Sequence, residues 1–267
     1  MNKRLFLSAM AMVWMAGIPG RVEAQEITGN HRLMESFIQD GAILRQGWLE
    51  AAAAYSHWGD GHDTELGARV AFSFKERVEV GGQFFYLDRT RPENSVLFGE
   101  RLASDLNENG PGDLDLYGKF RFRTEPRDWS AGLLVKLPGG DDRERLGSGR
   151  TDYEAFLATR QTFKKFAWIG NASLRLNGDS RTPGGGNGKL SAALGGGAIL
   201  KLSYAWALLA EMRYETRRYD GGDVDFRIVP AIDFRPNENL ALRLGVGFGL
   251  ADGAPDEEGT FSIVFHY

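Results

Sequence analysis

Apolar and polar residues alternate along most of the chain with a period of two residues. Between Glu65 and Lys75, apolar side chains hold the even-numbered positions, and polar or small side chains fill most of the odd-numbered ones. The same alternation returns at 113–123, 223–235 and 240–250. A period of two is typical of β-strands that bury or expose one apolar face. The pattern therefore predicts an all-β protein.

Twelve such segments follow one another, each close to the roughly 9–11 residues that a tilted membrane strand requires. The connections between them alternate between short turns and mostly longer, polar or glycine-rich loops. This order predicts a closed antiparallel up-and-down transmembrane β-barrel, with short turns in the periplasm and longer loops outside. A soluble sandwich or lipocalin-like barrel is the alternative, but its loops would not be ordered by length. The segments lie at 48–57, 64–75, 77–87, 112–123, 128–137, 151–162, 165–177, 189–201, 205–217, 222–235, 239–250 and 259–267.

Two features bear on how these segments pair. The last strand must close the barrel against the first, because open strand edges cannot be satisfied in lipid. Its apolar face is expected to meet lipid, and a terminal aromatic also resembles the C-terminal signal that outer-membrane assembly machinery recognises. Pro230, in the tenth segment, has no amide N–H, so we expect a bulge or a local break in pairing there. The apolar face at the end of the chain consists of Phe261, Ile263, Phe265 and Tyr267.

The first 24 residues have the three parts of a secretory signal peptide. A basic start is followed by an apolar stretch that ends near residue 18, and then by a small-residue site at 22–24. We expect cleavage between Ala24 and Gln25, because the apolar stretch is short for a bilayer span of about 20 residues. Export combined with a barrel predicts a multi-pass protein of the cell outer membrane in a Gram-negative bacterium.

Residues 25–47 separate the signal peptide from the barrel, which is expected to occupy 48–267. Within them, Leu33, Phe37 and Ile38 have roughly helical spacing for a couple of turns. This segment either enters the barrel as a plug or gate, or forms a periplasmic tail or short helix at the rim. The second reading is the simpler one, because chain ends outside a packed core are commonly loose.

Composition narrows the possible functions. The first 24 residues carry a net charge of +2, so the mature chain carries −6 against −4 for the full chain. A negative chain argues against a nucleic-acid partner, which requires a basic surface. The chain has no cysteine and therefore neither disulfides nor thiol chemistry. A mean hydropathy of −0.33 with 35 glycines suits a barrel, whose strands hide hydrophobicity by alternation.

The polar face of the predicted strands is rich in charge. On several strands acidic residues come first and basic residues later, as with Asp113 and Asp115 before Lys119. One interpretation is that these charges form cross-strand ion pairs that stabilise the interior. The other is that they line a narrow polar pore and select what enters it. The pore-lining candidates are chosen only because the alternation places them on the inward face of their strands. They are Arg121, Arg123, Lys136, Arg160, Arg175, Arg213 and Arg243.

Catalysis is the weaker hypothesis. A Ser–His pair requires hydrogen-bond reach, and His266 falls at the periplasmic end, away from surface lipids. His57 and His62 flank the first predicted outer loop beside two aspartates, where solvated side chains are the simpler reading than a metal site. The glycine-rich stretch 184–191 lacks the first glycine and the Ser or Thr of a phosphate-binding loop. We therefore expect no catalytic residues, no metal and no cofactor.

The middle of the chain carries three recurrent turn motifs. They are Gly110-Pro111-Gly112-Asp113 before one strand, Leu137-Pro138-Gly139-Gly140 after the next, and Leu146-Gly147-Ser148-Gly149 with Asp152 before a third. Over about 110–180 this arrangement resembles the meta-pathway phenol-degradation family of outer-membrane proteins. The usual Thr of the second motif is Gly139 in this chain, and Trp48 to Tyr55 fits the first strand of the family.

That resemblance implies an outer-membrane barrel that passes small molecules, since members are described as transporters linked to aromatic degradation. We therefore expect a channel or passive transporter for a small solute that is aromatic or hydrophobic. A closed structural or adhesive barrel is the alternative, and a lipid-modifying outer-membrane enzyme is the third. The expected partners are outer-membrane lipids and lipopolysaccharide, the assembly machinery and the solute.

Overall fold

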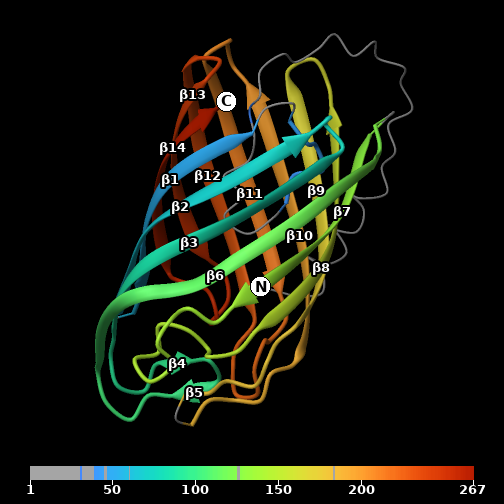
Figure 1. The fold of residues 1–267 in the computed structure, drawn as a ribbon. Helices are drawn as coiled ribbons and strands as arrows, with labels where there is room; N and C mark the ends of the chain where they lie inside the picture. The colour runs from blue at the N-terminus through green and yellow to red at the C-terminus, as the bar shows by residue number, and fades with distance from the viewer. Residues whose placement is uncertain (1–30, 32–38, 45–46, 60, 125–126, 183) are drawn as a thin grey trace, which may run out of the picture.

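The computed structural model describes residue 31 and residues 39–44, 47–59, 61–124, 127–182 and 184–267. Twelve long strands form a closed antiparallel barrel, and two short strands form a hairpin within one loop (Figure 1). The hairpin is β4 (Val96–Leu97) with β5 (Glu100–Arg101). In barrel order, the strands are β1 (Trp48–Trp58), β2 (Gly61–Phe74), β3 (Val78–Arg91), β6 (Leu106–Arg123), β7 (Asp128–Leu137), β8 (Asp152–Thr162), β9 (Phe166–Leu176), β10 (Leu190–Lys201), β11 (Trp206–Glu215), β12 (Asp225–Asn237), β13 (Leu240–Gly249) and β14 (Glu257–His266).

The predicted fold is confirmed, with each sequence segment matching one strand of the barrel. β14 closes the sheet by pairing with β1 in a continuous register from Trp48–His266 to His57–Glu257. One end of the barrel carries the short turns and the other carries the longer loops. In outer-membrane barrels, the end with the short turns lies in the periplasm. These two ends are called the turn end and the loop end below.

The connections differ from expectation at two loops. The outer loop expected at 58–63 is mostly strand, because β1 and β2 remain paired up to Trp58 and Gly61. His57 and His62 are consequently opposite each other in the ladder instead of flanking a solvated loop. The loop expected at 88–111 is also partly strand, since β3 and β6 stay paired out to Arg91 and Leu106.

Pro230 breaks pairing on one side only. It lies opposite Ala210 in an uninterrupted register with β11. On the β13 side, the paired residues jump from Ile228 to Ala231 without a change of register. The expected break in pairing is therefore present, and no bulge accompanies it. The register shift in this strand pair lies farther along, between Phe234 and Asn237.

The outward face of the barrel is apolar. Large hydrophobic side chains are exposed on every barrel strand, and on β14 they include Phe261 and Phe265. Tyr267 follows on the same face, and its hydroxyl donates to the carbonyl of Ala71 at 3.2 Å. Outward apolar and inward polar residues are the arrangement of a barrel that spans a lipid bilayer. Among the described residues, no helix has the length and apolar character needed to cross a membrane.

A charge introduced on this face should reveal the lipid contact. Leu133, in the middle of β7, is 64% exposed. We expect Leu133→Arg to cost about 2–4 kcal/mol of folding stability in vesicles, because an arginine at the bilayer midplane loses its hydration. Urea unfolding of the refolded protein measures the loss. Leu133→Ala is the control, and an equal loss in both variants would contradict lipid exposure.

Candidate functional site

The loop-end half of the lumen contains a cavity of about 1020 Å³. On β1 its lining extends from Glu50 to Trp58, and on β14 from Ser262 to Glu258. Loop residues 95–99, 146–147 and 249–254 line its mouth. Because successive residues of a strand point to opposite faces, the polar residues of the sequence alternation supply most of the part of this lining that comes from strands.

Acidic side chains predominate in the cavity. Of the described residues that line it, eleven are acidic and six are basic, an excess of five carboxylates. Low-dielectric walls with one dominant sign of charge concentrate the opposite ion. The acidic residues are Glu50, Asp63, Glu65, Asp113, Asp152, Glu215, Asp223, Asp225, Asp252, Asp256 and Glu258, and the basic ones are Arg69, Arg89, Arg91, Lys136, Arg218 and Arg227.

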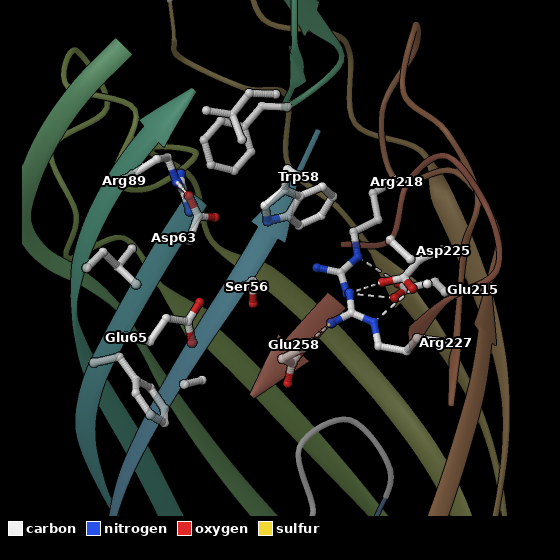
Figure 2. A pocket seen from close by; sticks show the side chains of 18 of the residues that line it. Ser56, Trp58, Asp63, Glu65, Arg89, Glu215, Arg218, Asp225, Arg227 and Glu258 are labelled. Atoms are coloured by element: carbon white, nitrogen blue, oxygen red, sulfur yellow. Dashed lines mark hydrogen bonds and ion pairs between the residues drawn. The ribbon is translucent and has the colours of Figure 1, made fainter. Parts of the chain in front are cut away.

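Two ion-pair groups face each other across the cavity (Figure 2). On the β2–β3 side, Asp63 lies 3.3 Å from Arg89 and 2.5 Å from Arg91. The Arg91 guanidinium also lies 3.9 Å from the ring centroid of Trp58. A cation over an aromatic ring is attracted to it. The Arg91 guanidinium therefore covers one face of the Trp58 ring near the mouth of the cavity.

The opposite group joins β11, β12 and β14. Arg218 donates to Glu215 at 2.8 and 2.6 Å. Arg227 donates to Asp225 at 3.0 Å and to Glu258 at 3.2 Å. Each guanidinium contacts at least one carboxylate, so these cations are largely neutralised and the surplus negative charge of the cavity remains.

The loops fold inward over the mouth. The ring of Phe98, next to the β4–β5 hairpin, packs edge-on against Tyr219 with 5.9 Å between centroids. Glu100 of the hairpin pairs with Arg145 at 3.1 Å. Tyr219 lies in the loop between β11 and β12, and its burial there raises the pKa of its phenol. The hairpin is therefore held to two other loops and narrows the entrance to the cavity.

The turn-end half of the lumen is filled differently. Residues 39–44 lie inside it, and Asp40 is 1% exposed. Lys119 donates to the Asp40 carbonyl at 3.1 Å, Ser130 donates to the Gly41 carbonyl at 2.5 Å, and Arg160 pairs with the Asp40 carboxylate at 2.7 Å. Backbone of the segment before β1 is thus bonded directly to the barrel wall.

His31 makes a further contact in the same half. Its Nδ1 lies 2.5 Å from Asp233, and its carbonyl accepts from Arg160 at 3.2 Å. Asp233 also faces Arg235 at 3.2 Å and Arg243 at 3.6 Å. The Asp233 carboxylate therefore contacts three basic side chains: Arg235 and Arg243 from the barrel wall and His31 from the segment before β1.

The seven predicted pore-lining residues fall into three groups. Lys136 lines the cavity and contacts Asp113 at 3.1 Å and Asp152 at 2.9 Å. Arg123 is exposed beside the β6–β7 turn. The other five lie outside the cavity lining and are each paired with an acid: Arg121 with Glu76 and Asp128, Arg160 with Asp40, Arg175 with Glu154, Arg213 with Glu215, and Arg243 with Asp233.

The sequence analysis noted acidic residues on the inward faces but chose only basic side chains as pore-lining candidates, and so missed the acidic character of the lining. The alternation did contain the signal, since Asp63 and Glu65 share the inward parity of β2 with Arg69. The predicted signal cleavage at Ala24 and Gln25 lies outside the described residues. Among those that are described, no group of three or more His, Asp or Glu side chains is arranged to hold a metal ion.

A closed twelve-stranded barrel with an apolar outer belt and a charged lumen belongs to the class of outer-membrane β-barrels. No protein-family model matches the chain, and no curated protein matches it in sequence. Solved structures do match its fold. The COG4313 outer membrane channel from Pseudomonas putida F1 is 13% identical with a TM-score of 0.62, and the match covers 89% of this chain and 100% of that one.

Two porins are also similar. The NanC porin matches with a TM-score of 0.55 and 9% identity, and the KdgM porin with 0.54 and 8% identity. Each match covers 82% of this chain and 99% of the porin. At such low identity the likeness establishes the fold, and it places this barrel among porin-like architectures.

Proposed function

We propose that the protein is a passive channel or transporter for a small solute across the outer membrane. The observation that carries this proposal is the charged cavity of about 1020 Å³ inside a closed barrel, lined at its mouth by loops. A lumen built only to stabilise a barrel needs no such space, since well-packed interiors leave few voids. The porins and the channel of similar fold support the same reading.

The segment 25–47 is proposed to act as a plug or gate at the turn end. The bonds from Lys119, Ser130 and Arg160 to residues 40–42 support this role. A solute that enters from the loop end would meet this segment before it reached the periplasm. Passage would then require the segment to move or to leave a narrow path beside it.

The resemblance in the turn motifs around 110–152 supports an aromatic or hydrophobic solute of the kind implied by the meta-pathway phenol-degradation family. We also propose that Phe261, Ile263, Phe265 and Tyr267 are the assembly signal. Outer-membrane lipids and lipopolysaccharide are then the surroundings of the folded barrel. The outward exposure of Phe261, Phe265 and Tyr267 is compatible with both roles.

A closed structural barrel is the second candidate, favoured by the dense ion pairs in the turn-end half. Lys119 and Glu79, for example, lie 3.1 Å apart with both side chains fully buried. An enzyme is the least supported. His57 and His62 are cross-strand neighbours at the loop end, and the ring of His62 stacks on Tyr55 at 5.6 Å. We therefore propose that the protein is not an enzyme.

Conductance of the purified, refolded protein in a planar bilayer tests the proposal. We expect discrete steps and a reversal potential of the sign for cation preference under a KCl gradient, because carboxylates exceed bases in the cavity. Asp223→Asn, at the exposed mouth, should lower that preference, and more so at low salt. A silent bilayer with folding shown by heat-modifiable gel mobility would favour the closed barrel.

A further inference from the structure

The wall formed by β14, β1, β2 and β3 contains a recess within the cavity. Ala52 of β1 lies opposite Ser262 of β14 on one side and Gly67 of β2 on the other. One inward position nearer the loop end, Ala54 lies between Thr260 and Glu65 in the same way. The two alanines thus leave room that larger inward side chains fill elsewhere, whereas the space over Gly67 is filled by the ring of Phe85.

Polar side chains without partners border this recess. Glu50 and Ser262 are each 1% exposed and Thr260 is 7% exposed, and all three line the cavity. Among the described residues, Glu50 Oε1, Ser262 Oγ and Thr260 Oγ1 have no hydrogen-bond partner. Buried polar atoms are nearly always hydrogen-bonded. Thr260 Oγ1 is turned toward Gly245 of β13. Glu50 Oε1 and Ser262 Oγ therefore point to a ligand that supplies donors.

Glu65 adds a second carboxylate. Its side chain projects into the cavity from β2 and makes no hydrogen bond or ion pair with the described residues (Figure 2). Glu50 borders the recess from the turn-end side, where its other oxygen lies 3.5 Å from Arg69. The recess therefore has one carboxylate toward each end of the barrel and the hydroxyl of Ser262 along one side.

The remaining side is aromatic. Phe85 of β3 lies opposite Gly67 and lines the cavity. The Arg69 guanidinium lies 5.2 Å from its ring centroid, so Arg69 is drawn toward the ring as well as toward Glu50. Burial of an apolar group against Phe85 is favourable, whereas a polar group there would lose its hydrogen bonds to water without gaining a partner.

From this arrangement we propose that the recess binds the protonated amino group of a small amine, with its apolar body against Phe85. An ammonium group has three donors and no acceptor, which matches a site of two carboxylates and one hydroxyl. The excess of carboxylates in the cavity favours its entry over that of an anion. The proposal names a solute class for the channel proposed above and rests on that function.

A divalent metal ion fits the recess less well. Calcium takes about 6–8 oxygen ligands at roughly 2.3–2.6 Å, and no group of three or more acidic or histidine side chains suited to a metal occurs in the described part of the chain. The positive charge of Arg69, 3.5 Å from Glu50, opposes a divalent ion more strongly than a monovalent one.

Isothermal titration of the refolded full-length protein tests this assignment with three probes of similar shape: 2-phenylethylammonium, 2-phenylethanol and phenylacetate. We expect the ammonium probe to bind about tenfold or more tightly than the other two, since charge-assisted hydrogen bonds are the strong ones. Glu65→Gln should weaken its binding by about tenfold. Ala54→Leu should abolish binding by filling the recess. Asp88→Asn removes an exposed carboxylate from the outward face of β3 and should leave the affinity unchanged.

Equal binding of the three probes would overturn the proposal, as would calcium chloride that binds while the ammonium probe does not. If Glu65→Gln fails to fold, Ser262→Ala decides, because it removes one acceptor and no charge. Unchanged affinity in a folded Ser262→Ala and Glu65→Gln pair would also refute the site. Conductance separates the two proposals: amine binding with a silent bilayer contradicts the channel alone, and conductance without amine binding contradicts the recess alone.

Discussion

Deletion of Gln25 to Gln46, with the signal peptide retained, should raise the single-channel conductance several-fold. The described residues 39–44 lie in the turn-end half of the lumen, where Lys119, Ser130 and Arg160 hold them. Their removal frees cross-section in a barrel that has an interior larger than that of eight-stranded barrels. Planar-bilayer recording of the refolded variant, with its folding checked by gel mobility, measures the effect.

The same deletion should reduce the cation preference. Lys119 and Arg160 would lose the carbonyl and carboxylate oxygens that Asp40 supplies to them. Lys119 would keep its pair with Glu79, whereas the charge of Arg160 would act on ions in the widened path. Asp40→Asn is the matched control, because it keeps the segment at full length and weakens only its ion pair with Arg160. It should give more frequent current fluctuations and a smaller gain. Unchanged conductance in the folded deletion variant would refute a plugging role.

Lys119→Met should destabilise the barrel by about 3–5 kcal/mol, the usual cost when one partner of a buried ion pair is removed. Lys119 Nζ lies 3.1 Å from Glu79 Oε1, and both side chains are fully buried. Tyr117 donates to the same carboxylate oxygen at 3.0 Å, but a neutral donor cannot replace the lost charge. Urea unfolding of the refolded protein in vesicles measures the change in free energy.

The double variant Lys119→Met with Glu79→Gln is the control for this prediction. It removes the uncompensated charge and should recover most of the lost stability, since neutral replacements of buried ion pairs are often tolerated. A single variant that loses less than about 1 kcal/mol, in the range of exposed pairs, would show that water reaches Glu79 and Lys119.

The alternation predicted the fold because the strand period and the lipid-facing belt are local properties of the chain. Leu133 and Phe265 could be assigned to the outer face in this way, and both are exposed. Strand ends were less predictable. Pairing of β1 with β2 continues up to Trp58 and Gly61, and a polar run such as 58–63 does not reveal whether its backbone is paired.

The candidate site was only partly predictable. The alternation along a strand determines which side chains point into the lumen, but not their position along the barrel axis or their partners. Lys136 is one of the residues that line the cavity, whereas Arg175 and Arg213 pair with Glu154 and Glu215 and lie outside the lining. The contacts of Asp40 depend on a segment that has no strand period. The recess depends on registers across four strands, and those registers follow from turns and loops far apart in the sequence.

The seam between β1 and β14 has a consequence for how the protein is made. It joins residues about two hundred positions apart, beginning with Trp48 and His266. Contacts of such long range form slowly, because a long stretch of chain must be ordered first. A ribosome has to finish nearly the whole polypeptide before this seam can form. A chain that ends prematurely therefore keeps the edge of β1 unpaired, with a row of open N–H and C=O groups that can pair with another chain.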